Sequence, residues 1–310
     1  MLSAISADSA RIEGVTTVVA VDSMSGSDCS LTDAESVSEQ DWTLLIAPES
    51  GGALAALSRD VERVGGRLLG PSSQFIELTS DKHRTAERLR SAGVPAPFGF
   101  LLPAAAPLPR EFDYPAVLKP CDGAGSQDTW LVESAPATCG DVRLPHNRRL
   151  RRLERFCPGT AASVAVLCGP AGLTPLMPCS QRLSGDGRFQ YLGGALPLDN
   201  DLAARATDLA VRALRTLPAA RGYVGVDMVL GDDPSGSGDV VVEVNPRLTT
   251  SYVGLRALCH QNLALAMIEI ASGSRFDLSW RAGRVEFDPI GQVTIVDKPP
   301  AAFSETRMPR

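Results

Sequence analysis

The sequence lacks the features of a nucleic-acid-binding, membrane-bound or secreted protein. Its 30 Lys and Arg residues are fewer than its 36 Asp and Glu residues. The net charge of −6 makes a nucleic-acid partner unexpected, although it leaves room for a local basic groove. No apolar run approaches the roughly 20 residues of a membrane-spanning helix, so no membrane partner is expected either. The N-terminus has no basic region of the kind that begins a signal peptide, which favours a cytoplasmic location.

The chain also has few residues that would hold a structural metal. Its seven cysteines are irregularly spaced and include no Cys-x-x-Cys pair, which indicates reduced thiols more than a disulfide framework or a zinc site. The three histidines, His83, His146 and His260, lie far apart, so no histidine cluster is predicted. With 44% hydrophobic and 21% charged residues over 310 positions, the composition is that of a globular protein with two or three subdomains.

What the chain does have is a pair of β-branched, apolar segments at residues 222–230 and 240–247, joined by a loop rich in Gly, Asp and Ser. If positions 230 and 240 close a hairpin, Asp227 lies opposite Glu243. This register predicts one apolar face, formed by Val224, Val226, Met228, Leu230, Val240, Val242 and Val244. A slip of one residue would place a carboxylate in the core, so the pattern itself favours this pairing.

The opposite face of this hairpin carries Asp227, Glu243 and Asn245. Three oxygen ligands on one wall match the preference of Mg²⁺, whose octahedron phosphate oxygens and water would complete. The alternative is an ordinary half-exposed hairpin with scattered acidic residues.

A lysine followed by glycines precedes the hairpin. Residues 114–120 are predicted to form a strand that ends near Lys119, and Gly123 and Gly125 follow it. Glycines let backbone N–H groups approach phosphate oxygens, and a lysine supplies a charge that spans them. Glycine-rich turns after strands are common, and this one is neither a Walker A loop nor a dinucleotide-binding fingerprint, so the motif alone is weak.

The N-terminal segments predict a small α/β unit over the first 77 residues. Residues 16–21 and 42–47 are expected to form short buried strands, and residues 51–64 a helix that ends at a Gly-Gly pair. The polar residues 23–40 are expected to form a loop or a weak helix. Ser80 is expected to cap the next helix.

Later segments complete the outline. Residues 103–109 form a Pro/Ala linker, and the basic stretch 143–155 is expected to be a solvated helix face more than a phosphate- or partner-binding patch. Residues 203–217 and 263–271 are predicted to be amphipathic helices. Residues 293–296 are predicted to form a strand, and the last dozen residues to be frayed.

The order of the motifs resembles that of the ATP-grasp superfamily of carboxylate–amine ligases. The matching segments are Ser80-Asp-Lys82, Tyr114-Pro-Ala-Val-Leu-Lys119 with its glycine loop, Glu154-Arg-Phe-Cys-Pro-Gly159, Asp227 and Glu243-Val-Asn-Pro-Arg247. The last segment, with the upstream Asp, is the specific part of a resemblance that covers roughly residues 40–270. It implies an α/β (α+β) ATP-grasp fold in three parts. These are an N-terminal Rossmann-like pre-ATP-grasp domain at 1–77, a linker helix with a small ATP-lid subdomain at 78–155, and a C-terminal mixed-sheet subdomain with the metal site at 156–310.

The resemblance also implies roles for single side chains. Lys82 and Lys119 resemble the two lysines that hold the ATP phosphates. The phosphate-covering loop corresponds to Asp122, Gly123, Gly125 and Ser126, and the adenine-contacting strand to Glu154, Phe156 and Cys157. The ligands of Mg²⁺ or Mn²⁺ correspond to Asp227, Glu243 and Asn245, and the catalytic residues to Lys119 and Arg247, the arginine against the transferred phosphate or acyl phosphate. The ribose-binding acid of many members has no counterpart in residues 160–163, so another residue or water must serve.

Four short segments are most similar to the tyramine–glutamate ligase group of methanofuran-type one-carbon cofactor biosynthesis. They are residues 47–52, 162–166, 223–227 and 245–252. The implied function is ATP-dependent formation of an amide between a small-molecule carboxylate, such as glutamate, and an amine through an acyl phosphate. A homodimer is left open.

Two alternatives remain. One is an ATP-grasp enzyme whose acyl phosphate has another fate, or a phosphotransferase. The other is a catalytically silent ATP-binding regulatory or assembly protein. The complete set of lysines, acids and arginine speaks against a silent protein, because a regulator can lose its metal ligands and still bind nucleotide.

Two further groups of residues keep two interpretations each. Residues 249–252, Thr-Thr-Ser-Tyr, would supply hydroxyl groups to an acceptor substrate or simply begin a capped helix. Glu49 follows a predicted strand of the first domain, where α/β proteins usually bind ligands, and would hold an amine or lie in a surface turn.

Overall fold

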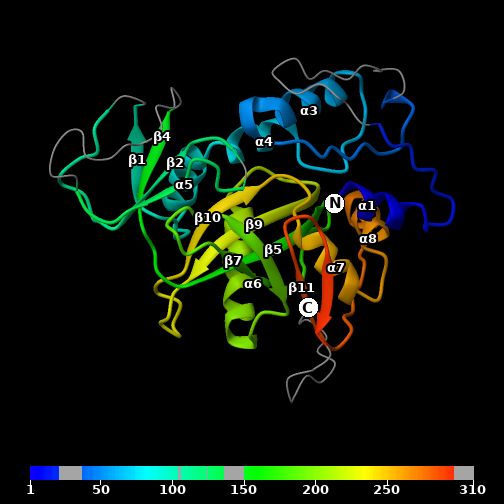
Figure 1. The fold of residues 1–310 in the computed structure, drawn as a ribbon. Coiled ribbons are helices and arrows are strands. Elements are labelled where there is room, and N and C mark those ends of the chain that lie inside the picture. The colour runs from blue at the N-terminus through cyan, green and yellow to red at the C-terminus, as the bar shows by residue number, and fades with distance from the viewer. Residues whose placement is uncertain (21–36, 104–105, 124, 136–149, 297–310) are drawn as a thin grey trace.

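A computed structural model describes residues 1–20, 37–103, 106–123, 125–135 and 150–296 of the chain (Figure 1). Two β-sheets organise it, one of four strands and one of eight. Within the described ranges, no helix is both long and apolar enough to cross a bilayer.

The smaller sheet is antiparallel and has the strand order β1-β4-β2-β3. Its strands are β1 (Gly99–Leu102), β2 (Ala116–Pro120), β3 (Trp130–Val132) and β4 (Arg151–Arg155). Leu102, Leu118 and Leu153 form part of its apolar core. In Figure 1 this sheet lies to one side of the larger sheet.

The basic stretch at residues 143–155 is described only at its end, and there the predicted solvated helix face is wrong. Arg151 and Arg152 belong to strand β4 and are only 7% and 0% exposed. Arg152 is buried because its guanidinium bonds to Glu154, His83 and the backbone oxygen of Pro97. Residues 143–149 lie outside the described residues.

The larger sheet runs in the order β10-β9-β5-β7-β8-β11-β12, with β6 paired to β5. Its strands are β5 (Thr160–Gly169), β6 (Gly172–Pro175), β7 (Cys179–Leu183), β8 (Tyr191–Leu196), β9 (Gly222–Leu230), β10 (Val240–Asn245), β11 (Arg284–Phe287) and β12 (Val293–Val296). All of its pairings are antiparallel. The predicted late strand is confirmed as β12.

Helices cover both faces of the larger sheet, and the alternation of side chains along β9 shows how. Val224 and Val226 are buried in the core that includes α6 (Asn200–Arg215). Tyr223 points to the other face and belongs to the core of α7 (Ser251–Leu258) and α8 (Leu263–Ser272). The two predicted amphipathic helices are confirmed as α6 and α8.

The N-terminal part is mainly helical where it is described. Its elements are α1 (Leu2–Ser9), the 3-10 turn η1 (Ser50–Gly52), α3 (Ala53–Arg63), α4 (Ser73–Thr79) and α5 (Lys82–Ser91). The predicted helix at residues 51–64 is confirmed as α3. The polar residues expected as a loop or weak helix lie largely in the undescribed range 21–36, so that expectation stays a prediction.

The two N-terminal strands that the sequence predicts are not formed in the described residues. Val18 and Val19 are 67% and 48% exposed, although their apolar, β-branched character led us to expect burial. Residues 42–47 contribute one isolated parallel bridge, between Thr43 and Leu68. β-propensity describes how well a side chain fits a half-buried sheet, and without partner strands it does not create one.

Helix α5 is capped by Asp81, so the predicted cap at Ser80 is wrong. The Asp81 carboxylate accepts hydrogen bonds from the backbone N–H groups of His83 and Arg84, both at 2.9 Å. Ser80 instead ends α4, a helix that the sequence analysis did not include. This cap places Lys82 at the first position of α5, where its side chain reaches the site described below.

Helix α1 is fastened to the C-terminal helices through Asp8. This carboxylate is only 5% exposed and accepts hydrogen bonds from Tyr252 Oη at 2.7 Å and Arg256 Nε at 2.8 Å. Asn262 Nδ2 donates to the backbone oxygen of Asp8 at 2.7 Å. Burial alone would raise the pKa of Asp8, but the bonds from Arg256 and Tyr252 outweigh burial and lower it.

Candidate functional site

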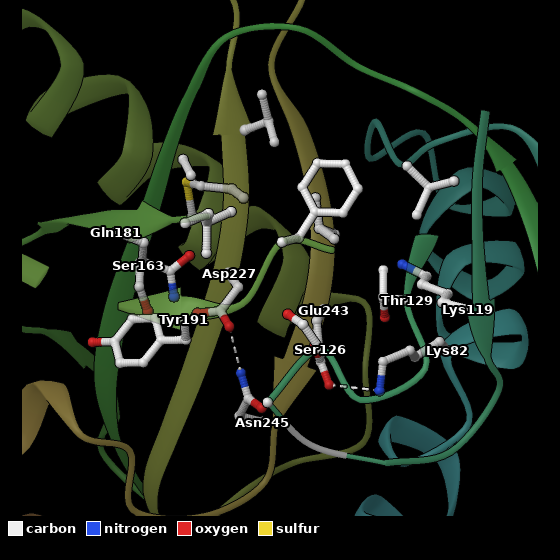
Figure 2. A pocket seen from close by; sticks show the side chains of 18 of the residues that line it. Lys82, Lys119, Ser126, Thr129, Ser163, Gln181, Tyr191, Asp227, Glu243 and Asn245 are labelled. Carbon is white, nitrogen blue, oxygen red and sulfur yellow. Dashed lines mark hydrogen bonds and ion pairs between the residues drawn. The ribbon is translucent and has the colours of Figure 1, made fainter. Parts of the chain in front are cut away.

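A cleft of about 550 Å³ separates the smaller sheet from the larger one. One side is formed by β2 and the loop after it, and the other by β7, β9 and β10. Every residue to which the family resemblance assigns a nucleotide, metal or catalytic role lines this cleft: Lys82, Lys119, Asp122, Gly123, Gly125, Ser126, Glu154, Phe156, Cys157, Asp227, Glu243, Asn245 and Arg247. Figure 2 shows the two lysines on one side and the acidic hairpin on the other.

The acidic hairpin of β9 and β10 has the predicted pairing at its functional end. Glu243 lies opposite Asp227. Near the turn the register differs from the prediction, because Val240 pairs with Val229 and not with Leu230.

A β-bulge at Val242 causes this difference, since it inserts one extra residue into β10. Val241 and Val244 are therefore buried in the core, whereas Val240 and Val242 are half-buried. Val242 lines the cleft. The predicted apolar face is wrong for Val240 and Val242, and the bulge turns the following residues so that Glu243 faces the cleft.

We call Asp227, Glu243 and Asn245 the acidic wall. Asn245 Nδ2 donates to Asp227 Oδ2 at 2.9 Å, the left dashed line in Figure 2. Ser163 and Gln181 also hydrogen-bond to the Asp227 carboxylate. Burial and the charge of Glu243 outweigh these bonds and raise the pKa of Asp227 to about 6. A cation between the two carboxylates would relieve their repulsion and favour the ionised form of Asp227.

Lys82 crosses the cleft from α5 to the acidic wall. Its Nζ forms an ion pair with Glu243 Oε1 at 2.7 Å (Figure 2) and donates to the backbone oxygen of Gly123 at 2.6 Å. Burial alone would lower the pKa of Lys82, but the nearby charges of Glu243, Glu49 and Asp122 outweigh burial and raise it. Lys82 is therefore charged and partly neutralises the wall.

Lys119 is buried in a second ionic network. Its ammonium pairs with the Glu154 carboxylate, which also accepts a hydrogen bond from Arg152 Nε at 2.8 Å. The Arg152 guanidinium makes two further contacts, with His83 Nδ1 at 2.6 Å and with the backbone oxygen of Pro97 at 2.7 Å. The Glu154 side chain is thus held by two cations, and removing either partner would leave a buried charge less well compensated.

The loop after β2 has the backbone that the glycines were expected to allow. Gly123 has φ 122° and Gly125 has φ 70°, both in the region that favours glycine. Ser126 follows with φ 59°. The backbone N–H of Gly51 donates to Asp122 Oδ2 at 3.2 Å, so the η1 turn of the N-terminal part touches this loop.

Residues 155–158 leave the smaller sheet and enter the larger one. The backbone N–H of Phe156 donates to the oxygen of Pro115 at 3.1 Å, and the Phe156 ring stacks near Phe189 with 6.1 Å between ring centroids. Burial raises the pKa of the half-buried Cys157, so its thiol is neutral. Phe156, Cys157 and Phe189 all line the cleft, and apolar side chains of this kind suit a flat aromatic base.

Arg247 follows the acidic wall and is fixed by Glu49. Its Nε donates to Glu49 Oε1 at 2.7 Å, and its Nη1 donates to the Leu248 backbone oxygen at 3.4 Å. Glu49 is only 4% exposed, so the interpretation as a surface turn is wrong. Among the described residues, Glu49 Oε2 has no hydrogen-bond partner.

Three hydroxyl groups lie together beside the cleft, which Thr249 and Ser251 line. Tyr223 Oη lies 2.8 Å from Thr249 Oγ1 and 3.0 Å from Ser251 Oγ, and these two oxygens are 2.8 Å apart. Helix α7 begins in this segment, at Ser251, so the predicted helix start is confirmed. The N-cap Thr250 makes no side-chain capping bond, so the predicted cap is wrong. Tyr252 points away from the cleft, to Asp8.

The donors of the acidic wall fit a hard divalent cation. Two carboxylates and one side-chain amide project from neighbouring strands, and oxygen donors of this kind are what Mg²⁺ takes. Within the described ranges, no three His, Cys, Asp or Glu side chains are placed to hold a metal ion. A cation here would therefore need the Asn245 amide oxygen, and further oxygens from a bound substrate or water.

Ser163 and Gln181, which hydrogen-bond to Asp227, were not predicted from the sequence. Ser163 lies directly opposite Asp227 in the β5–β9 pairing, and Gln181 belongs to β7. Ser163 gave one signal, since it interrupts an otherwise apolar run in β5. Gln181 gave none, because polar residues on a strand next to an open cleft look like ordinary surface residues.

Comparison with known proteins is consistent with this geometry. Residues 79–251 match the family model of the ATP-grasp domain, and residues 5–76 match that of the pre ATP-grasp 3 domain. The tyramine–L-glutamate ligase of Methanocaldococcus fervens is 25% identical over 247 residues, which are 80% of this chain and 71% of that protein.

Two solved structures share the fold. An ATP-grasp superfamily protein from Archaeoglobus fulgidus superposes with a TM-score of 0.61 at 24% identity, over 81% of this chain and 70% of that one. The biotin carboxylase domain of the Hydrogenobacter thermophilus 2-oxoglutarate carboxylase, solved with MgADP, superposes with a TM-score of 0.60 at 18% identity, over 82% and 60% of the two chains.

Proposed function

Because this chain belongs to the ATP-grasp family of ligases that form C–N bonds, we propose that it joins a carboxylate to an amine through an acyl phosphate, with glutamate as the first candidate acid. The observation that carries this proposal is the arrangement across the cleft. The acidic wall faces Lys82 and Lys119 and lies next to Arg247 along one cavity. This arrangement brings cations to an anionic substrate and oxygen ligands to a divalent cation.

The proposed chemistry is positioning and charge neutralisation. Lys82 and Lys119 would bind the phosphates of ATP, and the loop of Gly123 and Gly125 would cover them. Phe156 would contact the adenine. No protein nucleophile is needed, because the substrate carboxylate itself attacks the γ-phosphate in line and the amine then displaces phosphate from the acyl phosphate.

The acidic wall would hold Mg²⁺ through Asp227, Glu243 and Asn245, and the bound ion would neutralise charge on the phosphoryl group in transfer. Lys82 pairs with Glu243 at 2.7 Å, so entry of the cation must coincide with a shift of this lysine toward the phosphates. Arg247 would stabilise the acyl phosphate from the other side. In this proposal the two lysines and the arginine surround the reacting anion.

The choice of acid and amine is the finer part of the proposal. Glutamate is supported by the Methanocaldococcus relative, whose name gives tyramine and L-glutamate as its substrates. A role in methanofuran-type cofactor assembly would follow from the same likeness. The cluster of Tyr223, Thr249 and Ser251 offers hydroxyl groups for orienting such a polar substrate.

The division into parts at residues 1–77, 78–155 and 156–310 belongs to the same proposal. It is supported by the two separate sheets, which meet where β4 ends and β5 begins. A reducing, cytoplasmic location is supported by the five described cysteines, all of which are free thiols.

The test is a screen for ADP release with pairs of carboxylates and amines, in which glutamate and tyramine form the first pair. Products are identified by mass spectrometry. We expect ADP release that requires both substrates and an amide product of their combined mass less one water. ADP release with the acid alone and no amide product would favour a phosphotransferase or another fate of the acyl phosphate.

The silent alternative makes a different prediction. A regulatory or assembly protein would bind MgATP, as shown by a thermal shift, without ADP release for any pair. The variant Glu243→Gln separates the two cases, because it should lower ADP release at least about a hundredfold in a ligase, whereas a silent protein releases no ADP with or without the substitution.

A further inference from the structure

Glu49, a buried acid directly before the η1 turn, reaches Arg247 in the wall of the cleft. We propose that Glu49 is a positioning residue, which holds Arg247 so that its guanidinium presents its remaining N–H groups to an anion beside the nucleotide. This inference rests on the proposed function, since it assigns Arg247 to the transferred phosphate or acyl phosphate.

The first support is the geometry of the pair. Glu49 Oε1 accepts a hydrogen bond from Arg247 Nε at 2.7 Å, from a position 198 residues away in the chain. Arg247 Nη1 makes only a 3.4 Å contact with Leu248. Arg247 Nη2 takes no part in either of these bonds, and the side chain lines the cleft. Bonding at Nε therefore fixes the plane of the guanidinium and leaves its two terminal nitrogens for an anion.

The second support is the burial of Glu49. Its residue surface is 4% exposed, and its Oε2 has no hydrogen bond within the described part of the chain. An unpaired buried carboxylate oxygen destabilises a fold, so a neutral or apolar side chain would suit a purely structural position better. The negative charge is useful here because it acts on two cations of the cleft, Arg247 and Lys82.

The third support is the position of the turn. Glu49 is followed by η1, whose Gly51 N–H donates to Asp122 Oδ2 in the glycine loop. The same turn thus contacts the loop that would cover the phosphates and the arginine that would face them. The N-terminal part sets the spacing between these two groups by touching both.

A purely structural role for Glu49 makes a different prediction. If the residue only attached the N-terminal part, its loss would lower stability and weaken every ligand alike. A positioning role predicts a selective loss, in which nucleotide binding is kept and binding of the second anion is lost. The substitution Glu49→Gln suits this test, because it is isosteric and removes the charge alone.

The experiment is isothermal titration calorimetry with two probes in sequence. MgADP is titrated first, and inorganic phosphate is then titrated into the MgADP complex as a mimic of the transferred group. We expect Glu49→Gln to leave the Kd of MgADP within about twofold of wild type and to weaken phosphate binding about ten- to hundredfold, the range for a hydrogen bond to a charged group. Glu77→Gln, an exposed acid of α4 paired with Arg59, is the control and should change neither Kd.

Two further variants test whether Glu49 acts through Arg247. Arg247→Met should abolish phosphate binding to the MgADP complex while Glu49 stays in place, and it should leave the Kd of MgADP within about twofold of wild type. Arg247→Lys keeps the positive charge but loses the bond from Nε, so it should weaken phosphate binding as Glu49→Gln does. This last variant keeps the test decisive if Glu49→Gln fails to fold.

The outcomes separate this inference from the proposed function. No MgADP binding by the wild type would overturn the proposed function and this inference with it. MgADP binding without phosphate binding by the wild type, or with equal phosphate binding by Glu49→Gln, would overturn the inference alone. An equal loss of both ligands in Glu49→Gln would show a structural role and would also overturn it.

Discussion

Asp227 and Glu243 lie opposite each other on neighbouring strands, and their repulsion decides how the acidic wall responds to pH. The folded pKa of Asp227, about 6, lies above its ordinary value of 3.8. The folded protein therefore holds this proton more tightly than the unfolded chain does. The stabilisation from this proton is complete below pH 3.8 and is lost as the pH rises through 6.

Because the Asp227 contribution to stability falls as the pH rises, replacing this carboxylate should stabilise the ligand-free protein at neutral pH. Asp227→Asn removes a carboxylate that is unfavourably ionised at neutral pH, so it should raise Tm at pH 7.5 and change it little at pH 4. Differential scanning fluorimetry at the two pH values checks this, with the exposed Asp208→Asn as control. A lower Tm of Asp227→Asn at pH 7.5 would contradict the assignment of a raised pKa.

Glu243 is predicted to be required for turnover. Glu243→Gln keeps the size of the side chain but removes one charge from the metal-binding wall and the ion pair with Lys82. We expect the fold to persist and turnover to fall at least about a hundredfold, because neutralisation of phosphoryl charge contributes several kcal/mol. ADP release is the measurement, and Glu286→Gln, at a half-buried acid paired with Arg182, is the control. Near wild-type ADP release would remove Glu243 from the site.

At the scale of elements, the loop after β2 is expected to close over the nucleotide. Lys119→Met keeps the apolar stem but deletes the charge. It leaves the buried Glu154 with Arg152 as its one cationic partner in the described network. ATP binding should therefore weaken, and phosphoryl transfer should slow. Gly125→Val keeps the charge but opposes the φ of 70°, which a β-branched residue rarely adopts. A Cβ atom added there would meet no atom within 4 Å, so backbone strain is the expected cause.

Limited proteolysis tests this prediction directly. MgATP should protect the wild type from cleavage near residues 121–130, and both variants should lose much of that protection. Gly65→Val serves as a control, because it places the same strain at a φ of 79° in a turn away from the cleft. If MgATP changes neither cleavage nor thermal stability of the wild type, this loop does not hold phosphate.

The hairpin shows how far the sequence could predict an element. The alternation of apolar and acidic residues placed Asp227 opposite Glu243, because a one-residue slip there would bury a carboxylate. The bulge at Val242 was invisible, since valines stand on both sides of it and one extra residue leaves the apolar pattern almost unchanged. Local patterns therefore predicted the functional end of the hairpin and missed its geometry near the turn.

At the scale of the whole molecule, contacts between distant segments were the part that the sequence could not supply. Nothing near Glu49 indicates that it pairs with Arg247, and nothing near Ser80 shows that Asp81 makes the better cap. Val18 and Val19 show that a strand-like sequence does not by itself form a strand. Both are exposed, and no strand pairs with them in the described residues. The family-wide order of motifs predicted the cleft, since the fold brings the same motifs together whatever the connecting segments do.

Asp8 joins the first helix to α7 and α8 through hydrogen bonds from Tyr252, Arg256 and Asn262. Asp8→Ala would leave Arg256 and Tyr252 without their shared acceptor, so the free energy of unfolding should fall by about 2–4 kcal/mol, while MgATP binding stays unchanged. Urea unfolding measures the first quantity and calorimetry the second. The exposed Asp208→Ala should cost less than about 0.5 kcal/mol.

The contribution of Asp8 to the free energy of unfolding changes with pH in the opposite direction to that of Asp227. The pKa of Asp8 is lowered in the folded protein, so its contribution is present above 3.8 and is lost as the pH falls through the folded pKa. The destabilisation by Asp8→Ala should therefore be full at pH 7 and shrink in strong acid. A destabilisation that stays constant down to pH 2 would show that α1 is held by packing and not by this carboxylate.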